Sequence, residues 1–159
     1  MLYEDAQDIV TLIKNNIHGL RITGQMHRKK DIITCIDFIT MNNLQLILSM
    51  FGRLFDNSLY LNRNGNNFIS MMLNGIDSSI FINVRMADDA YEFKYLKWMQ
   101  NITKKHAMDL FSKASKKNLK LSSRGLFNEN GERLDFEKFS DLKNYLFSKD
   151  IDEKNNTEN

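Results

Sequence analysis

The chain is poor in cysteine, proline and net charge. Its 159 residues include one cysteine, which excludes an internal disulfide framework and a zinc site built from several cysteines. Proline is absent, and together with abundant asparagine, lysine and isoleucine this composition is typical of an AT-rich coding genome. The formal net charge is only +2, so affinity for nucleic acid must come from local basic patches rather than from the field of the whole protein.

Membrane and export signals are also missing. No apolar run approaches the length of a membrane span, and the acidic start at residues 1–5 lacks the basic-then-apolar order of a signal peptide. Together with the single cysteine, these features predict an intracellular protein in a reducing compartment, without a membrane partner. The hydrophobic share of 42% and the charged share of 26% are ordinary for a globular protein.

Hydrophobic spacing predicts alternating helices and strands. Apolar residues recur at helical spacing over residues 3–17 and 42–55, whereas residues 32–40 are β-branched and apolar on both faces, as in a central strand. The other expected elements are strands at 20–23, 58–62, 67–73 and 79–86, a helical stretch from Ala90 to about Lys117 that breaks near Asn101, short strands within 119–136, and a final helix that ends near Phe147.

Polar residues mark the expected turns and helix starts. Asn64-Gly65 and Asn74-Gly75 are strong hairpin signals between the middle strands. Asn42 or Asn43 is expected to cap the helix over 42–55, and Ser140 to cap the last helix.

The order of these elements predicts an α+β fold. A mixed sheet with helices packed on one face would form a core over residues 1–100, and a small C-terminal α/β lobe would follow over residues 101–148. The polar residues 149–159 are expected to be a disordered tail.

A glycine turn, a basic residue and an apolar strand follow one another between Gly24 and Asp37. This order resembles the layout of a nucleotidyltransferase core, in which the turn and the basic residue, here Arg28, would cradle a triphosphate. Two aspartates one residue apart on the next strand then hold metal ions. Asp37 stands at the second of these positions, but the first is Cys35, and the later strand that should carry a third carboxylate offers Asn83.

The chain thus resembles the palm and nucleotide-selecting subdomains of the family X DNA polymerases, the group of DNA polymerase beta, and is most similar to their minimal viral members. Gly24 and Asp37 lie thirteen residues apart, which is the family's spacing. Residues 82–85 resemble the strand of the third carboxylate, and residues 116–132 resemble the C-terminal lobe. The resemblance implies a nucleotidyltransferase-like palm with a small lobe, and a viral protein would act in the host cytoplasm or the virion.

The departures from the family pattern fall on its metal site. Cys35 and Asn83 replace two of the three metal-binding aspartates, so Asp37 is left as the single carboxylate. A thiol is soft and mostly protonated near neutral pH, whereas Mg²⁺ prefers hard oxygen ligands. Asn83 also cannot accept the proton of an attacking hydroxyl group. No catalytic set is therefore intact, and polymerase chemistry is not expected.

The nucleotide pocket departs from the pattern as well. Gln25 replaces a serine that would contact the terminal phosphates, while Gly24 and Arg28 are kept. Residues 98–101 occupy the place of a turn that shapes the sugar pocket, but have lost its glycine and threonine. Gly24, Gln25 and Arg28 are therefore interpreted as the remnant of a nucleotide- or phosphate-binding site.

A lysine-rich stretch between residues 104 and 120 is the densest basic segment of the chain. In the resembling fold it would lie beside the DNA path, so we expect weak, sequence-independent DNA binding through it. Its members are Lys104, Lys105, Lys113, Lys116, Lys117 and Lys120.

A structural ion pair is expected where metals would otherwise sit. Asn83 and Arg85 share one face of their strand, and in the resembling fold that face meets Asp37. Because a partly buried carboxylate without a partner is costly, we expect Asp37 to pair with Arg85, with Asn83 nearby.

Three functions remain open. The leading hypothesis is a catalytically inactive DNA polymerase beta-like domain, without a cofactor, that acts as a DNA- or protein-binding subunit of a replication, repair or viral assembly. The second is an active DNA polymerase with an altered metal site and Mg²⁺ as its cofactor, which Asp37 and Arg28 favour and Cys35, Asn83 and Gln25 oppose. The third is a purely structural protein, favoured by the near-neutral charge, because fold alone does not choose among them.

Overall fold

The computed structural model describes residues 1–75 and 78–148. Two compact units make up the chain, Met1–Thr103 and Lys104–Asn159, whereas the boundary expected from the sequence lay between residues 100 and 101. The expected tail, 149–159, lies outside the described residues. None of the helices in the described part of the chain combines the length and the apolar composition that crossing a membrane requires.

The first unit is built on a mixed five-stranded sheet in the order β1-β2-β5-β4-β3. The β2 and β5 strands are parallel, and all other neighbours are antiparallel. Its elements are α1 (Tyr3–Asn16), β1 (Arg21–Thr23), α2 (Gly24–His27), β2 (Cys35–Thr40), α3 (Leu44–Phe55), a 3-10 turn η1 (Asp56–Ser58), β3 (Leu59–Gly65), β4 (Phe68–Asn74), β5 (Ser79–Met86) and α4 (Ala90–Asn101). The prediction of an α+β chain with a mixed sheet is confirmed.

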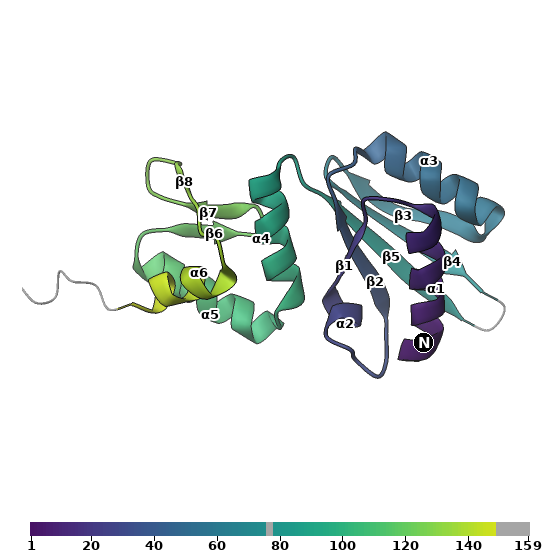
Figure 1. The fold of residues 1–159 in the computed structure, drawn as a ribbon, viewed down its shortest axis with the longest axis horizontal. Coiled ribbons are helices and arrows are strands. Elements are labelled where there is room, and N and C mark those ends of the chain that lie inside the picture. Colours follow the sequence, from purple (N-terminus) through teal and green to yellow (C-terminus); the bar gives the residue numbers. More distant parts are fainter. Residues whose placement is uncertain (76–77, 149–159) are drawn as a thin grey trace, which may run out of the picture. The chain divides into compact units, whose positions relative to one another are not determined.

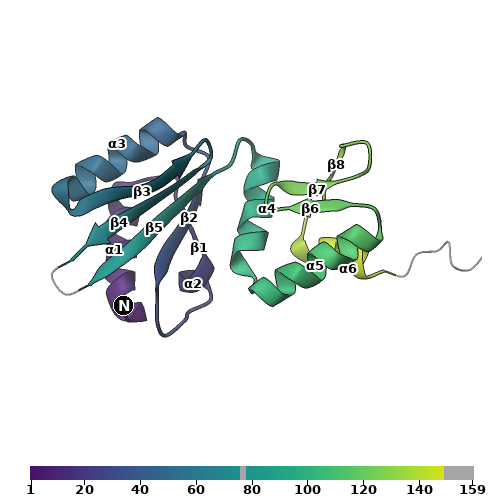
Figure 2. The same cartoon turned by 180° about the vertical axis from the view of Figure 1, so that it is seen from behind.

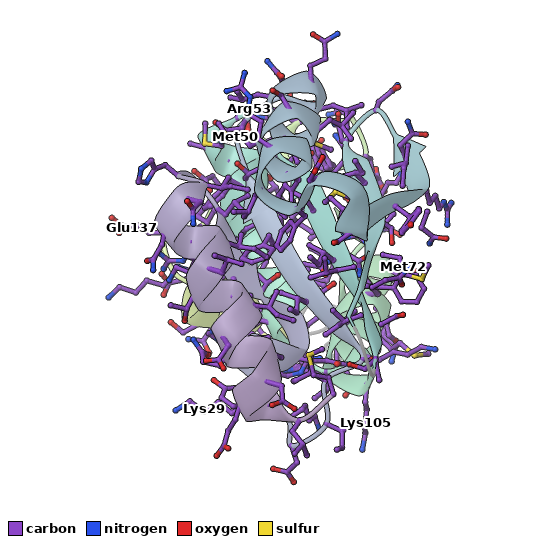
Figure 3. All side chains as sticks on the ribbon, turned by 90° about the vertical axis from the view of Figure 1, so that its right-hand side faces the viewer. Lys29, Met50, Arg53, Met72, Lys105 and Glu137 are labelled. Carbon is purple, nitrogen blue, oxygen red and sulfur yellow. The ribbon has the colours of Figure 1, made fainter. Side chains whose placement is uncertain are left out.

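One face of the sheet carries the main core. Alternate residues of β5, among them Ile82 and Val84, are fully buried, as are Ile36 and Phe38 of β2. They pack in one cluster with the inward sides of α1 and α3. Figure 1 shows α1 in front of the strands, and Figure 3 shows side chains filling the space between the two helices and the sheet. Burying each of these large apolar side chains stabilises the fold by about 1.5–3 kcal/mol.

The opposite face is also covered in part, so the expectation of helices on one face only is wrong. Ile39 is fully buried although it points away from its neighbour Phe38, and it packs with Ala87, Leu96 and Phe93. The helix α4 therefore covers the β1–β2 end of the second face. The physical reason is Ile39, a large apolar side chain that β2 presents on the second face and that needs burial there.

The second unit is a small three-stranded antiparallel sheet with two helices. Its elements are α5 (Lys104–Lys116), β6 (Lys120–Ser122), β7 (Gly125–Phe127), β8 (Arg133–Leu134) and α6 (Phe139–Phe147). Leu110 and Ala114 of α5 and Leu142 and Leu146 of α6 are buried, and α5 contacts both β6 and α6. Each helix is amphipathic, so the two apolar stripes supply the core of this lobe.

The expected helix starts have different outcomes. The side chain of Asn43 accepts a hydrogen bond from the Leu46 N–H at 2.9 Å, which confirms an asparagine cap on α3. The prediction that Ser140 caps the last helix is wrong, because α6 begins at Phe139 and its N-cap position is Lys138. The Phe139 ring centroid lies 5.0 Å from the Lys143 ammonium group, four residues later on the same side of the helix.

Candidate functional site

The two central strands bring Asp37 and Asn83 face to face. The register of the parallel pair places them opposite each other, and Asn83 Nδ2 donates a hydrogen bond of 3.0 Å to Asp37 Oδ1. The predicted proximity of the two residues is therefore confirmed. An amide donor now occupies the side of the carboxylate that a second carboxylate would occupy in a metal site.

Cys35 supplies the second donor to the same carboxylate. Its Sγ lies 3.4 Å from Asp37 Oδ2, two residues along the strand and on the same face. Burial, then the negative charge of Asp37 and the hydrogen bond to it, raise the pKa of the Cys35 thiol from 9.0 to about 11. The thiol is therefore protonated near neutral pH and donates a proton to Asp37 rather than offering a thiolate to a metal.

Gly24 forms the third wall around Asp37. Its backbone has φ +67°, and a Cβ at this position would collide with the Asp37 carboxylate. Thr23, next to it, donates from Oγ1 to the backbone carbonyl of Asp37 at 3.3 Å. The Gly24 N–H, which would face a phosphate in a nucleotide-binding turn, donates instead to Asn101 Oδ1 at 3.3 Å. Only glycine fits this close approach with a positive φ.

Arg28 and Gln25 are both held by the protein's own groups. Arg28 Nη1 donates to the backbone carbonyls of Gln100 at 3.0 Å and Ile102 at 3.4 Å, so its guanidinium binds the C-terminal end of α4. The Gln25 side chain accepts from the Thr34 N–H at 2.8 Å and donates to Thr34 Oγ1 at 2.9 Å. The predicted break of the helical stretch near Asn101 is confirmed, because α4 ends at Asn101 and α5 begins at Lys104, so residues 98–101 form the last turn of α4.

Arg85 does not pair with Asp37, and this prediction is wrong. In the register Arg85 lies opposite Ile39 on one side and Phe68 on the other, two residue pairs beyond the Asp37–Asn83 pair. Its guanidinium carbon lies 4.8 Å from the centroid of the Phe68 ring, which is a cation–π contact. Neutral donors already satisfy both oxygens of Asp37, so the carboxylate needs no cation as a partner.

These groups do not fit a divalent metal pair. One carboxylate, one protonated thiol and one amide provide a single anionic oxygen ligand, whereas two Mg²⁺ ions need several. Within residues 1–75 and 78–148 there is no cluster of three or more histidine, cysteine or acidic side chains placed to hold a metal ion.

The expected DNA-binding lysines separate into two sets in the second unit. The ammonium group of Lys113 lies 5.3 Å from the centroid of the Phe147 ring, and that of Lys117 lies 5.9 Å from the Tyr145 ring. These two lysines pack along α6. The exposed set consists of Lys104, Lys105, Lys116 and Lys120.

An open part of the sheet was not identified from the sequence. On the face opposite the main core, the register aligns Tyr60, Met72, Phe81 and Cys35 in a row across β3, β4, β5 and β2. Figure 2 shows these strands from that side, and Figure 3 labels Met72 at the rim of the molecule. Tyr60 is 54% exposed and Phe81 is 41% exposed. The sequence predicted a strand over residues 79–86, but aligning its outward side chains with those of other strands requires the register.

A comparison of the sequence with protein-family models and with curated proteins finds no match. The likeness to the family X polymerases therefore rests on the spacing of the residues described above.

Proposed function

We propose that this chain is a non-catalytic, nucleotidyltransferase-like domain that binds DNA within a replication, repair or viral assembly. The proposal rests on one observation, which is that the polar groups of the candidate site are already hydrogen-bonded to other groups of the protein. Both oxygens of Asp37 accept hydrogen bonds from Asn83 and Cys35, and the Gly24 N–H is bonded to Asn101. The groups that would face metal and phosphate are bonded to the protein itself.

The chemistry of phosphoryl transfer supports this conclusion. Two-metal catalysis needs anionic oxygens that neutralise two divalent ions about 3.5–4 Å apart. Asp37 alone cannot do this, and the Cys35 thiol, with its pKa raised to about 11, stays neutral beside it. A general base for the attacking hydroxyl group is also missing at Asn83.

Binding of DNA is supported by surfaces that the protein leaves in solvent. Exposed Tyr60 and Phe81, with the exposed Arg63 on the neighbouring row, offer ring faces and positive charge on one sheet face. Stacking of bases on such rings, with cations beside the backbone, is the usual basis of sequence-tolerant single-strand binding. The exposed lysines of α5 and β6 add a phosphate-binding surface in the second unit.

Two measurements test the proposal together. Primer extension with Mg²⁺ or Mn²⁺ is expected to show no incorporation, and extension that disappears in Asp37→Ala would establish the active-polymerase alternative instead. A DNA titration across salt concentrations is expected to show a linear decrease of log affinity with log salt.

A control variant outside the second unit makes the binding test specific. Replacing Lys104, Lys105, Lys116 and Lys120 by glutamine is expected to lower the salt slope by roughly 0.7–0.9 for each phosphate that the protein no longer neutralises. The control, Lys29→Gln with Lys30→Gln, also removes surface lysines but leaves the second unit intact. No detectable DNA binding at low salt would favour the purely structural alternative.

A further inference from the structure

A cleft of about 510 Å³ in the first unit is lined by four basic side chains: Lys14, Arg21, His27 and Lys97. No acidic residue lines it. Leu20 and Ile22, from the edge strand β1 and the residue before it, provide its apolar lining. Concentrating one sign of charge in a concave surface focuses the electrostatic potential and attracts counter-ions of opposite charge.

The four basic side chains have no partners of their own. Across residues 1–75 and 78–148, none of the four makes a side-chain hydrogen bond, an ion pair or a ring contact. Arg28, by contrast, is bonded to the end of α4. The unpaired cations of Lys14, Arg21 and Lys97 share one cleft and repel one another, so an anion bound between them would gain charge-assisted hydrogen bonds and remove that repulsion.

Two hydrogen bonds already described at the candidate site, made by Gly24 and Arg28, also hold this cleft in shape. Its basic residues come from α1, β1, α2 and α4. Asn101, which also lines the cleft, accepts the Gly24 N–H, and Arg28 binds the Gln100 carbonyl. These bonds fix α4 against α2. They therefore hold Lys97 of α4 and His27 of α2 on the walls of the same cleft. A site whose cations are already positioned loses less entropy on binding.

We propose that this cleft binds a compact polyphosphate, namely the di- or triphosphate group of a nucleotide or an inorganic polyphosphate. Its volume lies within the range of small-ligand sites, about 300–1,000 Å³. Lysine and arginine are the usual phosphate ligands, and here they converge on one space, whereas a nucleic-acid backbone needs cations spaced along a track. The site differs from the Gly24–Arg28 turn, whose groups are already hydrogen-bonded, and it does not depend on the proposed DNA binding.

Calorimetric titration of the full chain with sodium triphosphate at low ionic strength tests the proposal. We expect saturable binding with one site, weakened about tenfold by Lys97→Gln and by Arg21→Gln, because each removes one charge-assisted contact. Lys14→Gln is a third variant on another element. The matched control is Lys30→Gln, an exposed lysine outside the cleft that makes the same charge change, and it is expected to leave the affinity within about twofold. Circular dichroism melting verifies that each variant is folded.

Parallel titrations with ATP and with oligo(dT) identify the source of the phosphate. Equal affinity for ATP and triphosphate supports recognition of the phosphates alone, and tighter binding of ATP supports a nucleotide. Three results would overturn the proposal: no triphosphate binding at low salt, an equal loss of affinity in Lys30→Gln, or cleft variants that weaken only oligo(dT). Lysine variants in α5 that abolish DNA binding but leave triphosphate binding intact would separate this site from the DNA-binding function.

Discussion

Asn83 Nδ2 donates a hydrogen bond of 3.0 Å to Asp37 Oδ1 across the parallel strands β5 and β2. Cys35 donates to the other oxygen at 3.4 Å, so two neutral groups satisfy one carboxylate. A partly buried carboxylate such as Asp37 is costly unless it is hydrogen-bonded, and these donors meet that need without a cation. The arrangement also means that a new negative charge at either position would meet Asp37 at hydrogen-bond distance.

Replacing Asn83 by aspartate is expected to destabilise the protein by about 1–3 kcal/mol at neutral pH, since it replaces a donor by a like charge. The repulsion raises the pKa of the carboxylate pair above its unfolded value. Stability is therefore retained at acidic pH and lost as the pH rises through the carboxylate range. Urea unfolding at several pH values measures this.

Asn83→Ala is the control for that experiment, because it removes the donor without adding a charge. Its loss of stability should lack the additional decrease between acidic and neutral pH. An Asn83→Asp protein as stable as the wild type at neutral pH would contradict the conclusion that the Asn83 side chain donates a hydrogen bond to Asp37.

Gly24→Ala is expected to destabilise strongly. The residue has φ +67°, which costs a non-glycine residue about 1–2 kcal/mol, and its Cβ would collide with the Asp37 carboxylate. Gly52 is a matched control, because it lies in α3 and no atom comes within 4 Å of an added Cβ. Gly52→Ala should stabilise by about 0.5–1 kcal/mol through helix propensity. Chemical denaturation measures the free energy of unfolding of both variants. The same change in both would show that the Asp37 carboxylate leaves room for a Cβ at residue 24.

The Cys35 thiol is expected to react slowly with alkylating reagents at pH 8, because its pKa is raised to about 11. The alkylation rate should increase as the pH rises toward 11, and Asp37→Asn should shift the profile to lower pH by removing a negative charge. Since the folded pKa lies above the ordinary value of 9.0, the associated stability is present below pH 9 and is lost as the pH rises toward 11. A small thiol under identical conditions is the reference, and a rate that matches it at pH 8 would contradict the assignment.

Much of the architecture was predictable because it follows from local periodicity. Hydrophobic spacing indicated a strand over residues 79–86, which β5 confirms. The Asn64-Gly65 pair indicated a hairpin between the strands that became β3 and β4, but both residues are paired within β3 and the turn lies at Asn66 and Asn67. The position of α4 was not predictable in this way. Ile39 needs cover on the second face, but its sequence neighbours do not indicate which helix supplies that cover.

The candidate site was predictable in its residues but not in their partners. Spacing placed Cys35 and Asp37 on one strand face, since residues two apart share a face, and the resemblance to the family X polymerases implied that Asn83 lies beside them. The partner of Arg85 depended on the register of β4, which puts Phe68 beside it. The cationic cleft could not be predicted, because its four residues come from elements distant in the sequence.

Replacing Arg28 tests whether its side chain has a structural role or binds phosphate. Its guanidinium donates to the Gln100 and Ile102 carbonyls, so Arg28→Ala is expected to lower the free energy of unfolding by about 1.5–3 kcal/mol, the range for hydrogen bonds to charged groups. Lys30→Ala, an exposed neighbour with the same charge, should stay within about 0.5 kcal/mol of the wild type. Urea unfolding and DNA titration of both variants decide the question. An Arg28→Ala protein of unchanged stability that binds phosphate or DNA less tightly would show that the side chain faces a ligand instead of the end of α4.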